Sequence, residues 1–478
     1  MLASSRVLLW VAFIAACSGS GDTTGLTSAT TGASGGGGTS GEATSDTAPT
    51  GYKLDLGAPE SEGEGGGARP CENLECQIPS CPMGQETVIR GTVFAPEGTL
   101  PLYNVVAYVP NAPPGAVPGG LYCATCKANL PGDPIVAAIT DTRGEFTLKK
   151  TPAGADIPLV ITIGKWRRQV TLPHVEPCAD NVVDPALTRL PRRQIEGDLP
   201  KIAAVTGGRD RLECLLRRIG IDDGEFSSEG GPGRVHIYAG RGGANRISDE
   251  LGGEDFSPAQ SLWDNPGRLA DYDMLVLSCE GSTDEKNKSH QARQNLVDYA
   301  DAGGRIFLSH WHNVWIAKGA GGWPSAATFD HSPDLPSPFV VGFAMTFPKG
   351  VALAEWMTHV DGLDPYGEVT IFEGQNTIAS VNPEASTRWI HAVDPEGVQC
   401  FSFNTPLGAP RDAICGRVVD TDIHVTSGGG SKTFPKNCPG IDEPLTAQEK
   451  VLMFMLFDLS ACLLPDDEIP HIPGPLPG

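Results

Sequence analysis

The chain has 478 residues, which is more than one hydrophobic core usually organises, so two or more folded domains are expected. Its 35 Lys and Arg residues against 58 Asp and Glu residues give a formal net charge of −23, and the basic residues form only short clusters. This balance disfavours binding to nucleic acid through phosphate contacts.

The first residues have the pattern of an export signal. Arg6 supplies a positive charge, and the apolar residues 7–16 are too few to span a membrane as a helix. They end in Ile14-Ala15-Ala16-Cys17, which resembles a bacterial lipobox, where the cysteine becomes a lipidated N-terminus. Secretory cleavage near Ala16 is the alternative. The resemblance implies a signal peptide over residues 1–16, lipidation of Cys17, and export to the outer membrane, where the lipid provides the membrane contact.

Two segments have the composition of flexible chain. Residues 17–70 are rich in Ser, Thr, Gly and Ala and hold almost no large apolar side chain, so they predict a disordered tether. Residues 465–478 are rich in Pro and predict a flexible tail. The folded domains are therefore expected between residues 71 and 464.

Twelve cysteines follow Cys17, and in an oxidising compartment disulfide bonds are their default use. Spacing does not determine the connectivity, although Cys400 with Cys415 and Cys438 with Cys462 are plausible local pairs. A CxxC motif lies in a Pro/Gly-rich loop and not at the start of a helix, which disfavours a redox role. The disulfide candidates are Cys71, Cys76, Cys81, Cys123, Cys126, Cys178, Cys214, Cys279, Cys400, Cys415, Cys438 and Cys462.

Residues 71–190 predict a β-sandwich with a cysteine-rich entry. Short segments with alternating apolar residues are separated by Pro/Gly turns. The motifs at residues 89–93 (IRGTV), 105–109 (VVAYV) and 140–148 (TDTRGEFTL) resemble a carboxypeptidase regulatory-like domain of transthyretin type. The resemblance implies an accessory domain without catalysis. A long insertion over residues 110–134 departs from the family pattern.

Residues 191–199 predict a linker, and residues 200–464 predict an α/β domain. Apolar strands are expected at residues 201–206 and 235–239, at the end of the segment 269–278, and at residues 305–308, with helices at residues 209–219, 288–302 and 445–464. Thr446 and Glu449 have the spacing of a capping box at the start of the last helix. Apolar strands that alternate with helices predict a parallel sheet covered on both faces. Shorter strands between residues 369 and 404 would extend the sheet or form a β-subdomain.

The order of these elements resembles the class I glutamine amidotransferase-like fold, a flavodoxin-like architecture that includes trehalose-utilisation-type domains. The motif DYDMLVL at residues 271–277, the Gly303-Gly304 pair before a strand, and His424 after a late strand carry the resemblance. The catalytic pattern is incomplete. Ser309 and His310 stand where the family has a cysteine flanked by small residues, and His424 is not followed by the catalytic glutamate. Glutaminase activity is therefore not expected.

Five polar residues near the predicted strand ends form the candidate site: His310, His312, His424, Asp422 and Glu280. Ligands sit at the carboxyl edge of such sheets. If the HWH segment is extended, both of its rings lie on one face, as some metal sites require. The alternative is that these residues are hydrogen-bonded to loops and only support the structure.

Cys279 also follows a predicted strand. It could act as a nucleophile, but in an exported protein a disulfide, for example to Cys214, is the favoured use. No cofactor is assigned, and a divalent metal ion at His310, His312 and His424 is the alternative.

The sequence favours a lipid-anchored cell-envelope protein that binds a glycan or protein of the envelope without turnover. It is similar in organisation to the multidomain lipoproteins of myxobacteria. The alternative, from a different class, is an envelope hydrolase that acts on glycans or peptides through the histidine cluster.

Overall fold

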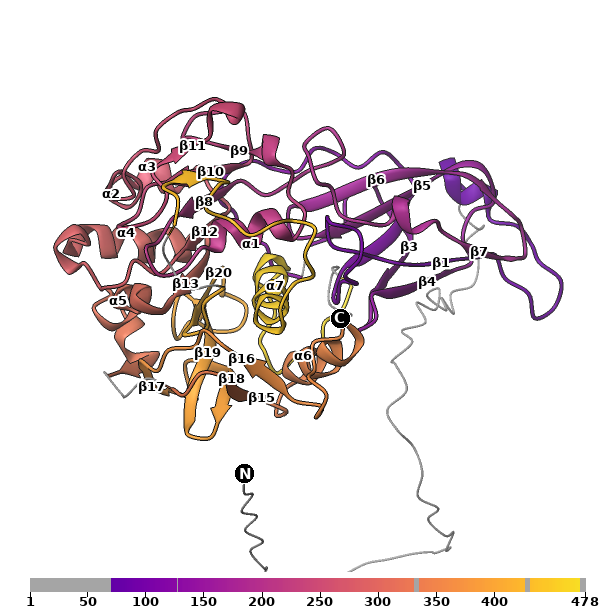
Figure 1. Cartoon of the computed structure of the whole chain (residues 1–478). Coiled ribbons are helices and arrows are strands. Elements are labelled where there is room, and N and C mark those ends of the chain that lie inside the picture. Colours follow the sequence, from indigo (N-terminus) through magenta and orange to yellow (C-terminus); the bar gives the residue numbers. More distant parts are fainter. Residues whose placement is uncertain (1–69, 127, 331–334, 426–429, 473–478) are drawn as a thin grey trace, which may run out of the picture. The chain divides into compact units, whose positions relative to one another are not determined.

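The computed structural model describes residues 70–126, 128–330, 335–425 and 430–472 (Figure 1). All of them belong to one compact unit. The expected signal peptide, the lipidation of Cys17 and the tether lie outside the described residues. Among the described residues, no helix is both long and apolar enough to cross a membrane. Within this unit the chain forms two regions with separate sheets, and several strands belong to mixed sheets.

The first region contains seven strands in two sheets. One sheet has the order β4-β1-β7 and the other β3-β2-β5-β6. Their apolar side chains, among them Ile89, Phe146 and Leu159, meet in one core. The strands are β1 (Val88–Thr92), β2 (Val106–Pro110), β3 (Pro134–Ile139), β4 (Glu145–Lys149), β5 (Gly154–Ile163), β6 (Trp166–Val175) and β7 (Asp180–Val182).

The second region is built on a ten-stranded sheet with the order β16-β15-β18-β19-β20-β13-β12-β8-β10-β9. The strands from β20 to β9 run parallel, whereas those from β16 to β19 are antiparallel. The strands are β8 (Ile202–Val205), β9 (Phe226–Ser227), β10 (Val235–Tyr238), β12 (Met274–Leu277), β13 (Arg305–Ser309), β15 (Phe339–Phe343), β16 (Val369–Ile371), β18 (Thr387–Val393), β19 (Glu396–Thr405) and β20 (Gly416–Thr421).

The expected parallel sheet is therefore found in the part from β20 to β9, whereas the strands that extend it on the other side are antiparallel. Only Asp394 and Pro395 separate β18 from β19. A parallel pair needs a crossover of a dozen or more residues, so such a short connection forces antiparallel pairing. The predicted short strands extend the sheet on this side. Two further small sheets pair β11 (Arg246–Ile247) with β21 (Thr433–Phe434) and β14 (Ala327–Phe329) with β17 (Ile378–Val381).

Helices cover both faces of the large sheet. Alternate side chains of each strand point to opposite faces, so Phe307 joins the core that contains the α1 and α7 side chains, and Leu308 joins the core that contains those of α4. The helices are α1 (Leu212–Arg218), α2 (Gln260–Trp263), α3 (Pro266–Leu269), α4 (His290–Asp301), α5 (Val314–Ala317), α6 (Pro348–His359) and α7 (Ala447–Ser460). The predicted capping box of Thr446 and Glu449 at the start of α7 is confirmed.

Seven 3-10 turns complete the described elements: η1 (Asn73–Gln77), η2 (Pro185–Leu187), η3 (Asp223–Glu225), η4 (Asp249–Leu251), η5 (Glu285–Asn287), η6 (His310–Asn313) and η7 (Trp323–Ser325). Of these, η6 directly follows β13, so the chain leaves the strand direction at His310.

Five disulfide bonds confirm the expected use of most cysteines. The bonds are Cys71–Cys76, Cys81–Cys178, Cys123–Cys415, Cys126–Cys462 and Cys214–Cys438. Cys279 and Cys400 are the described cysteines that are left free, and both are buried.

The structure contradicts the local cysteine pairs. The register of β19 and β20 places Cys400 opposite Thr421, whereas Cys415 lies beyond the opposite end of that ladder. Cys438 is bonded to Cys214, so neither Cys462 nor Cys279 takes the expected partner. These pairings depend on the fold and not on distance along the chain.

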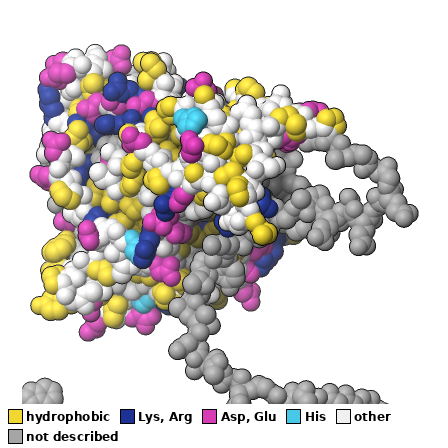
Figure 2. All heavy atoms as spheres, turned by 90° about the vertical axis from the view of Figure 1, so that its right-hand side faces the viewer, with side chains coloured by type: hydrophobic (Ala, Val, Ile, Leu, Met, Phe, Trp, Pro, Cys, Tyr) yellow, Lys and Arg dark blue, Asp and Glu magenta, His cyan; other side chains and the backbone are white. Residues whose placement is uncertain are grey.

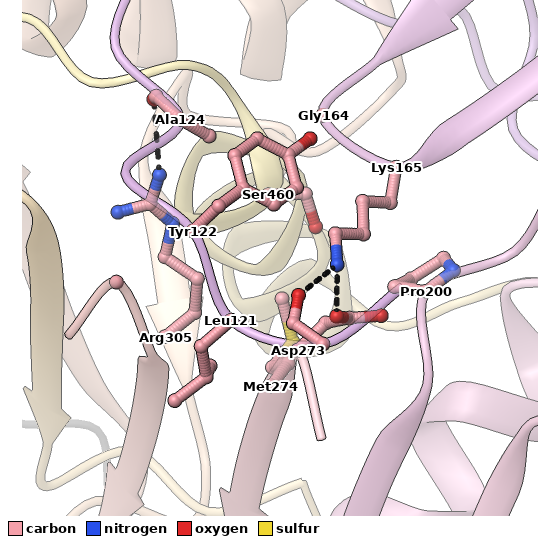
Figure 3. Close-up of a pocket in the computed structure, with 12 residues that line it drawn as sticks. Leu121, Tyr122, Ala124, Gly164, Lys165, Pro200, Asp273, Met274, Arg305 and Ser460 are labelled. Carbon is pink, nitrogen blue, oxygen red and sulfur yellow. Dashed lines mark hydrogen bonds and ion pairs between the residues drawn. The ribbon is translucent and has the colours of Figure 1, made fainter. Parts of the chain in front are cut away.

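The two regions are joined by side-chain contacts as well as by disulfides. The Trp166 and Phe457 rings lie 5.9 Å apart, and the Tyr103 and Phe454 rings stack at the same distance. Lys165 Nζ donates hydrogen bonds to the carboxylate of Asp273 and the Gly120 carbonyl (Figure 3). These residues line a cavity of about 40 Å³ at the amino ends of β12 and β13. This cavity therefore lies at the opposite edge of the sheet from the strand ends that carry the candidate residues.

Charged side chains of both signs are interspersed on the face shown in Figure 2. On this face, the Lys and Arg side chains form no continuous basic surface.

Candidate functional site

Three neighbouring parallel strands carry the candidate site at their carboxyl ends. Cys279 follows β12, His310 follows β13, and His424 follows β20. One potential ligand atom from each residue lies within 4.8 Å of the other two. Cys279 Sγ is 3.4 Å from His310 Nδ1, and the two imidazole centroids are 5.2 Å apart. The fold thus brings together three side chains that are at least 31 positions apart in the chain.

His310 has an unusual backbone conformation. Its φ of +46° lies in the left-handed region, which costs a residue other than glycine about 1–3 kcal/mol. The turn ends β13 at Ser309 and begins η6. The chain therefore leaves the strand direction at the residue whose ring contacts Cys279. Such strain is concentrated at functional sites, because surrounding structure must maintain it.

Asp210, in the loop after β8, connects the surrounding strand ends. Its Oδ2 accepts a hydrogen bond from Ser309 Oγ at 2.6 Å, and its Oδ1 accepts one from the Val425 backbone N–H at 2.8 Å. Asp210 is fully buried. A single carboxylate therefore holds the residue before His310 and the residue after His424.

The backbone also fixes His424. Its N–H donates to the Glu373 carbonyl at 2.7 Å, and its carbonyl accepts from Gln448 Nε2 at 2.8 Å. Gln448 belongs to α7, so this helix helps to hold the site. Within the described part of the chain, the buried Nε2 atom of His424 has no hydrogen-bond partner.

The three side chains are almost inaccessible to solvent. Cys279 is 0% exposed, and His310 and His424 are each 4% exposed. Burial raises the pKa of the Cys279 thiol to about 12, and burial lowers the pKa of His424. At neutral pH the thiol is therefore protonated, unlike the thiolate of a reactive cysteine.

His312 does not join the cluster, so the expectation that its ring lies on the same face as that of His310 is wrong. The segment is a 3-10 turn and not an extended strand. His312 Nε2 donates to the Ser278 carbonyl at 3.1 Å, and its Nδ1 accepts from Trp315 Nε1 at 2.9 Å. Both ring nitrogens are thus used by the structure, and burial holds the pKa of this imidazole well below its usual value.

The two candidate carboxylates also have structural partners. Asp422 accepts hydrogen bonds from the backbone N–H groups of Thr377 and Ile378 and from the Thr377 hydroxyl. Glu280 accepts from Lys288 Nζ at 2.6 Å and from the Arg241 backbone N–H at 2.8 Å. These hydrogen bonds hold the loops around the site. The candidate functional site therefore consists of Cys279, His310 and His424.

The sequence interpretation placed His310 and His424 in the candidate site, and the structure brings these two together. It assigned Cys279 to a disulfide and did not single out Asp210. The sequence signal for both was their position shortly after a buried strand of the sheet. A position after a strand predicts which residues meet only when the order of the strands in the sheet is known.

No protein-family model and no curated protein matches this chain. Among solved structures, a ThuA-like protein from Bacteroides uniformis is similar over 54% of this chain and 90% of its own, with 10% identity and a TM-score of 0.30. A type II cohesin–X-dockerin complex from Acetivibrio cellulolyticus is similar over 30% of this chain and 78% of its own, with 14% identity and a TM-score of 0.15. The first is a weak structural neighbour from the amidotransferase-like fold family. Neither similarity carries an argument about function.

Proposed function

We propose that this protein is a lipid-anchored cell-envelope protein that binds a transition-metal ion at Cys279, His310 and His424 and does not turn over a substrate. One observation carries the proposal: three buried donor side chains from adjacent strand ends lie within 4.8 Å of one another. Thiolate and imidazole are the ligands that zinc, copper and related ions take in proteins. A shift of about 1 Å by each side chain would bring all three donors to an ion between them.

The surroundings suit an ion better than a substrate. The three side chains are at most 4% exposed, which leaves a glycan or peptide no direct approach to them. Asp210, Glu373 and Gln448 provide the outer contacts that orient the strand ends. These contacts fix the backbone beside His310 and at His424, so they position two of the three proposed ligands.

The export part of the proposal is supported by the lipobox-like Ile14-Ala15-Ala16-Cys17 and by the five disulfide bonds, which are consistent with an oxidising compartment. Under this proposal, the first region is an accessory domain of carboxypeptidase regulatory-like type and the second is an amidotransferase-like domain. The envelope component, glycan or protein, would contact the folded part at a place other than the buried cluster.

A hydrolase is the second candidate because Cys279 Sγ lies 3.4 Å from His310 Nδ1, a distance typical of a nucleophile and its base. Burial of both residues argues against this function. Alkylation of the native protein by iodoacetamide distinguishes the candidates: a nucleophile reacts at Cys279 with the fold intact, whereas a closed metal site stays unmodified until the protein unfolds.

Metal analysis tests the main proposal. The full-length protein, purified in detergent without thiol reductants and stripped with a chelator, is dialysed in parallel against Co²⁺, Zn²⁺ and, anaerobically, Cu⁺. We expect one ion per chain for at least one of these metals and, where Co²⁺ binds, a thiolate charge-transfer band. The variant Cys279→Ser should lose both signals, while Cys400→Ser, which removes the other free buried thiol, should keep them. Equal metal content in the two variants would contradict the proposal.

A further inference from the structure

Resting on the proposed metal site, the geometry points to copper, bound by Cys279, His310 and His424 in a three-coordinate site. The donor set contains one sulfur and two imidazole nitrogens. A trigonal site of this composition is characteristic of copper, whereas zinc in proteins is almost always tetrahedral and needs a fourth ligand. The choice of ion therefore depends on whether a fourth ligand is available.

Three carboxylates beside the strand ends of the cluster are already engaged. Asp210 binds Ser309 and Val425, Asp422 binds the Thr377 segment, and Glu280 binds Lys288. To leave these partners, each carboxylate would have to abandon buried hydrogen bonds, at a cost of about 1–3 kcal/mol per unsatisfied group. Across the part of the chain that the structure describes, Asp420, four positions before His424, is buried without a hydrogen-bond partner, but it does not belong to the group of potential ligand atoms at the cluster. Among the described residues, the cluster of potential ligands at these strand ends therefore consists of three side chains.

Water is a poor substitute for the fourth ligand here. Open zinc sites keep a water molecule in the fourth position, which requires a channel or pocket beside the ion. Cys279 is 0% exposed, and each histidine is 4% exposed. A closed site with one thiolate and two imidazoles suits a low-coordinate ion, and Cu⁺ is one of the soft ions that thiolate ligands bind.

Backbone groups around the sulfur support the same conclusion. The Gly281 N–H donates to Cys279 Sγ at 3.4 Å, and the Trp311 N–H also hydrogen-bonds this sulfur. Two N–H donors stabilise negative charge on sulfur without acting as ligands. Hydrogen bonding around the cysteine sulfur is one of the properties that tune copper–thiolate centres. These hydrogen bonds would stabilise the thiolate once a bound metal ion displaces the thiol proton, and they add no fourth donor.

Competition between copper and zinc tests the inference. Full-length protein without metal is titrated anaerobically with Cu⁺ in the presence of the chromogenic chelator bicinchoninate. Thiol reductants are left out because they would open the disulfide bonds. We expect one Cu⁺ per chain, which excess Zn²⁺ does not displace. Addition of Cu²⁺ should produce an intense visible thiolate-to-copper band.

Two ligand variants and one control locate the ion. Cys279→Ser should weaken Cu⁺ binding by at least about 10-fold and abolish the Cu²⁺ band, because even outer contacts to metal ligands are worth that much. His424→Gln should weaken binding similarly, and it serves as the second ligand variant if Cys279→Ser does not fold. Cys400→Ser should match the wild-type protein, since Cys400 is an equally buried free thiol outside the cluster.

The outcomes separate the copper inference from the proposed function. If Zn²⁺ binds at these three residues and displaces Cu⁺, copper is overturned and the metal-binding function stands. If Cu⁺ binds equally to wild type and to both ligand variants, the copper lies elsewhere and the inference fails. If neither ion binds the wild-type protein, the proposed function fails together with the inference.

Discussion

Asp210 accepts a hydrogen bond from the Ser309 hydroxyl at 2.6 Å, and this bond connects the loop after β8 to the end of β13. The same carboxylate accepts from the Val425 N–H, so it reaches β20 as well. Four strands of the parallel part of the sheet, β8, β12, β13 and β20, therefore present their carboxyl ends to one small volume. Asp210 positions the backbone there without being one of the three clustered donors.

The first prediction concerns this carboxylate. Asp210→Ala would leave the Ser309 hydroxyl and the Val425 N–H buried without a partner, at about 1–3 kcal/mol each. We expect the free energy of unfolding to fall by roughly 2–5 kcal/mol, measured by urea denaturation. Asp210→Asn, which can accept from Val425 and donate to Ser309, should recover most of the loss. Equal destabilisation by both variants would mean that the charge, and not the two hydrogen bonds, is what matters.

The second prediction concerns the core strand that leads to the site. Phe307 is 0% exposed in β13, and truncation of a buried phenylalanine to alanine costs about 3–5 kcal/mol. Phe307→Ala should lower the free energy of unfolding by this amount. Tyr366→Ala is the control, since Tyr366 is 87% exposed and its truncation should change stability by less than about 0.5 kcal/mol. A loss below about 1 kcal/mol for Phe307→Ala would argue that β13 is not a central buried strand.

The third prediction concerns pH. Glu213 in α1 is completely buried, and burial raises the pKa of its carboxyl from 4.5 to about 7. The folded state binds the Glu213 proton more tightly than the unfolded state, so protonation of this carboxyl stabilises the fold. The stabilisation is fully present below about pH 4.5 and is lost as the pH rises through about 7, which lowers the free energy of unfolding by about 3 kcal/mol.

Glu213→Gln isolates this effect, because glutamine stays neutral and can still accept from Asn437 Nδ2. The free energies of unfolding of the wild type and the variant are compared at about pH 4.5 and about pH 8. The variant should gain stability relative to the wild type at the higher pH. An unchanged difference between the two pH values would show that Glu213 titrates normally in the folded protein.

How far the sequence predicts the fold depends on how local the signal is. Apolar runs and a capping box are local, so the strand at residues 305–308 and the cap formed by Thr446 and Glu449 were correctly predicted. The pairing of β15, β16, β18 and β19 onto one side of the sheet is a tertiary property. The apolar pattern within each strand does not reveal which strands pair. The prediction of a parallel sheet therefore did not include the antiparallel side.

The same distinction applies to the candidate site. His310 and His424 follow recognisable strands, so their meeting was predictable. His312 was misjudged because the turn at His310 rotates the next residues away from the strand direction. Cys279 was assigned to a disulfide because cysteine spacing does not reveal which pairs form. Asp210 was missed because a single aspartate after two glycines has no distinctive pattern.

The fourth prediction concerns the anchor. Replacing Cys17 with serine removes the thiol that a lipidation enzyme would modify. In Triton X-114 partitioning, we expect the Cys17→Ser variant to move from the detergent phase to the aqueous phase. The thermal unfolding midpoint of its folded region should equal that of the wild type. Unchanged partitioning would contradict the lipobox interpretation.

The fifth prediction concerns the segment 191–199. Arg193 has a side chain that is 56% exposed, and Ile195 beside it is 90% exposed, so trypsin should cut first near Arg193. The bonds Cys123–Cys415 and Cys126–Cys462 cross this position. Denaturing gels should therefore show a single species without reductant and two fragments with it. Two fragments without reductant would mean that these two bonds do not form.

The two crossing disulfides also bear on the order of events during export. Under the proposed export, Cys126 would be translocated 336 positions ahead of its partner Cys462, and Cys123 292 positions ahead of Cys415. The early region can fold around its own strands, but its thiols must wait in an oxidising compartment until the later segments arrive. During that interval Cys123 and Cys126, which are separated by two residues in a loop, are each other's nearest cysteines in sequence. A temporary bond between them would have to be exchanged for the final ones, so maturation of this protein should depend on the cell's disulfide isomerase.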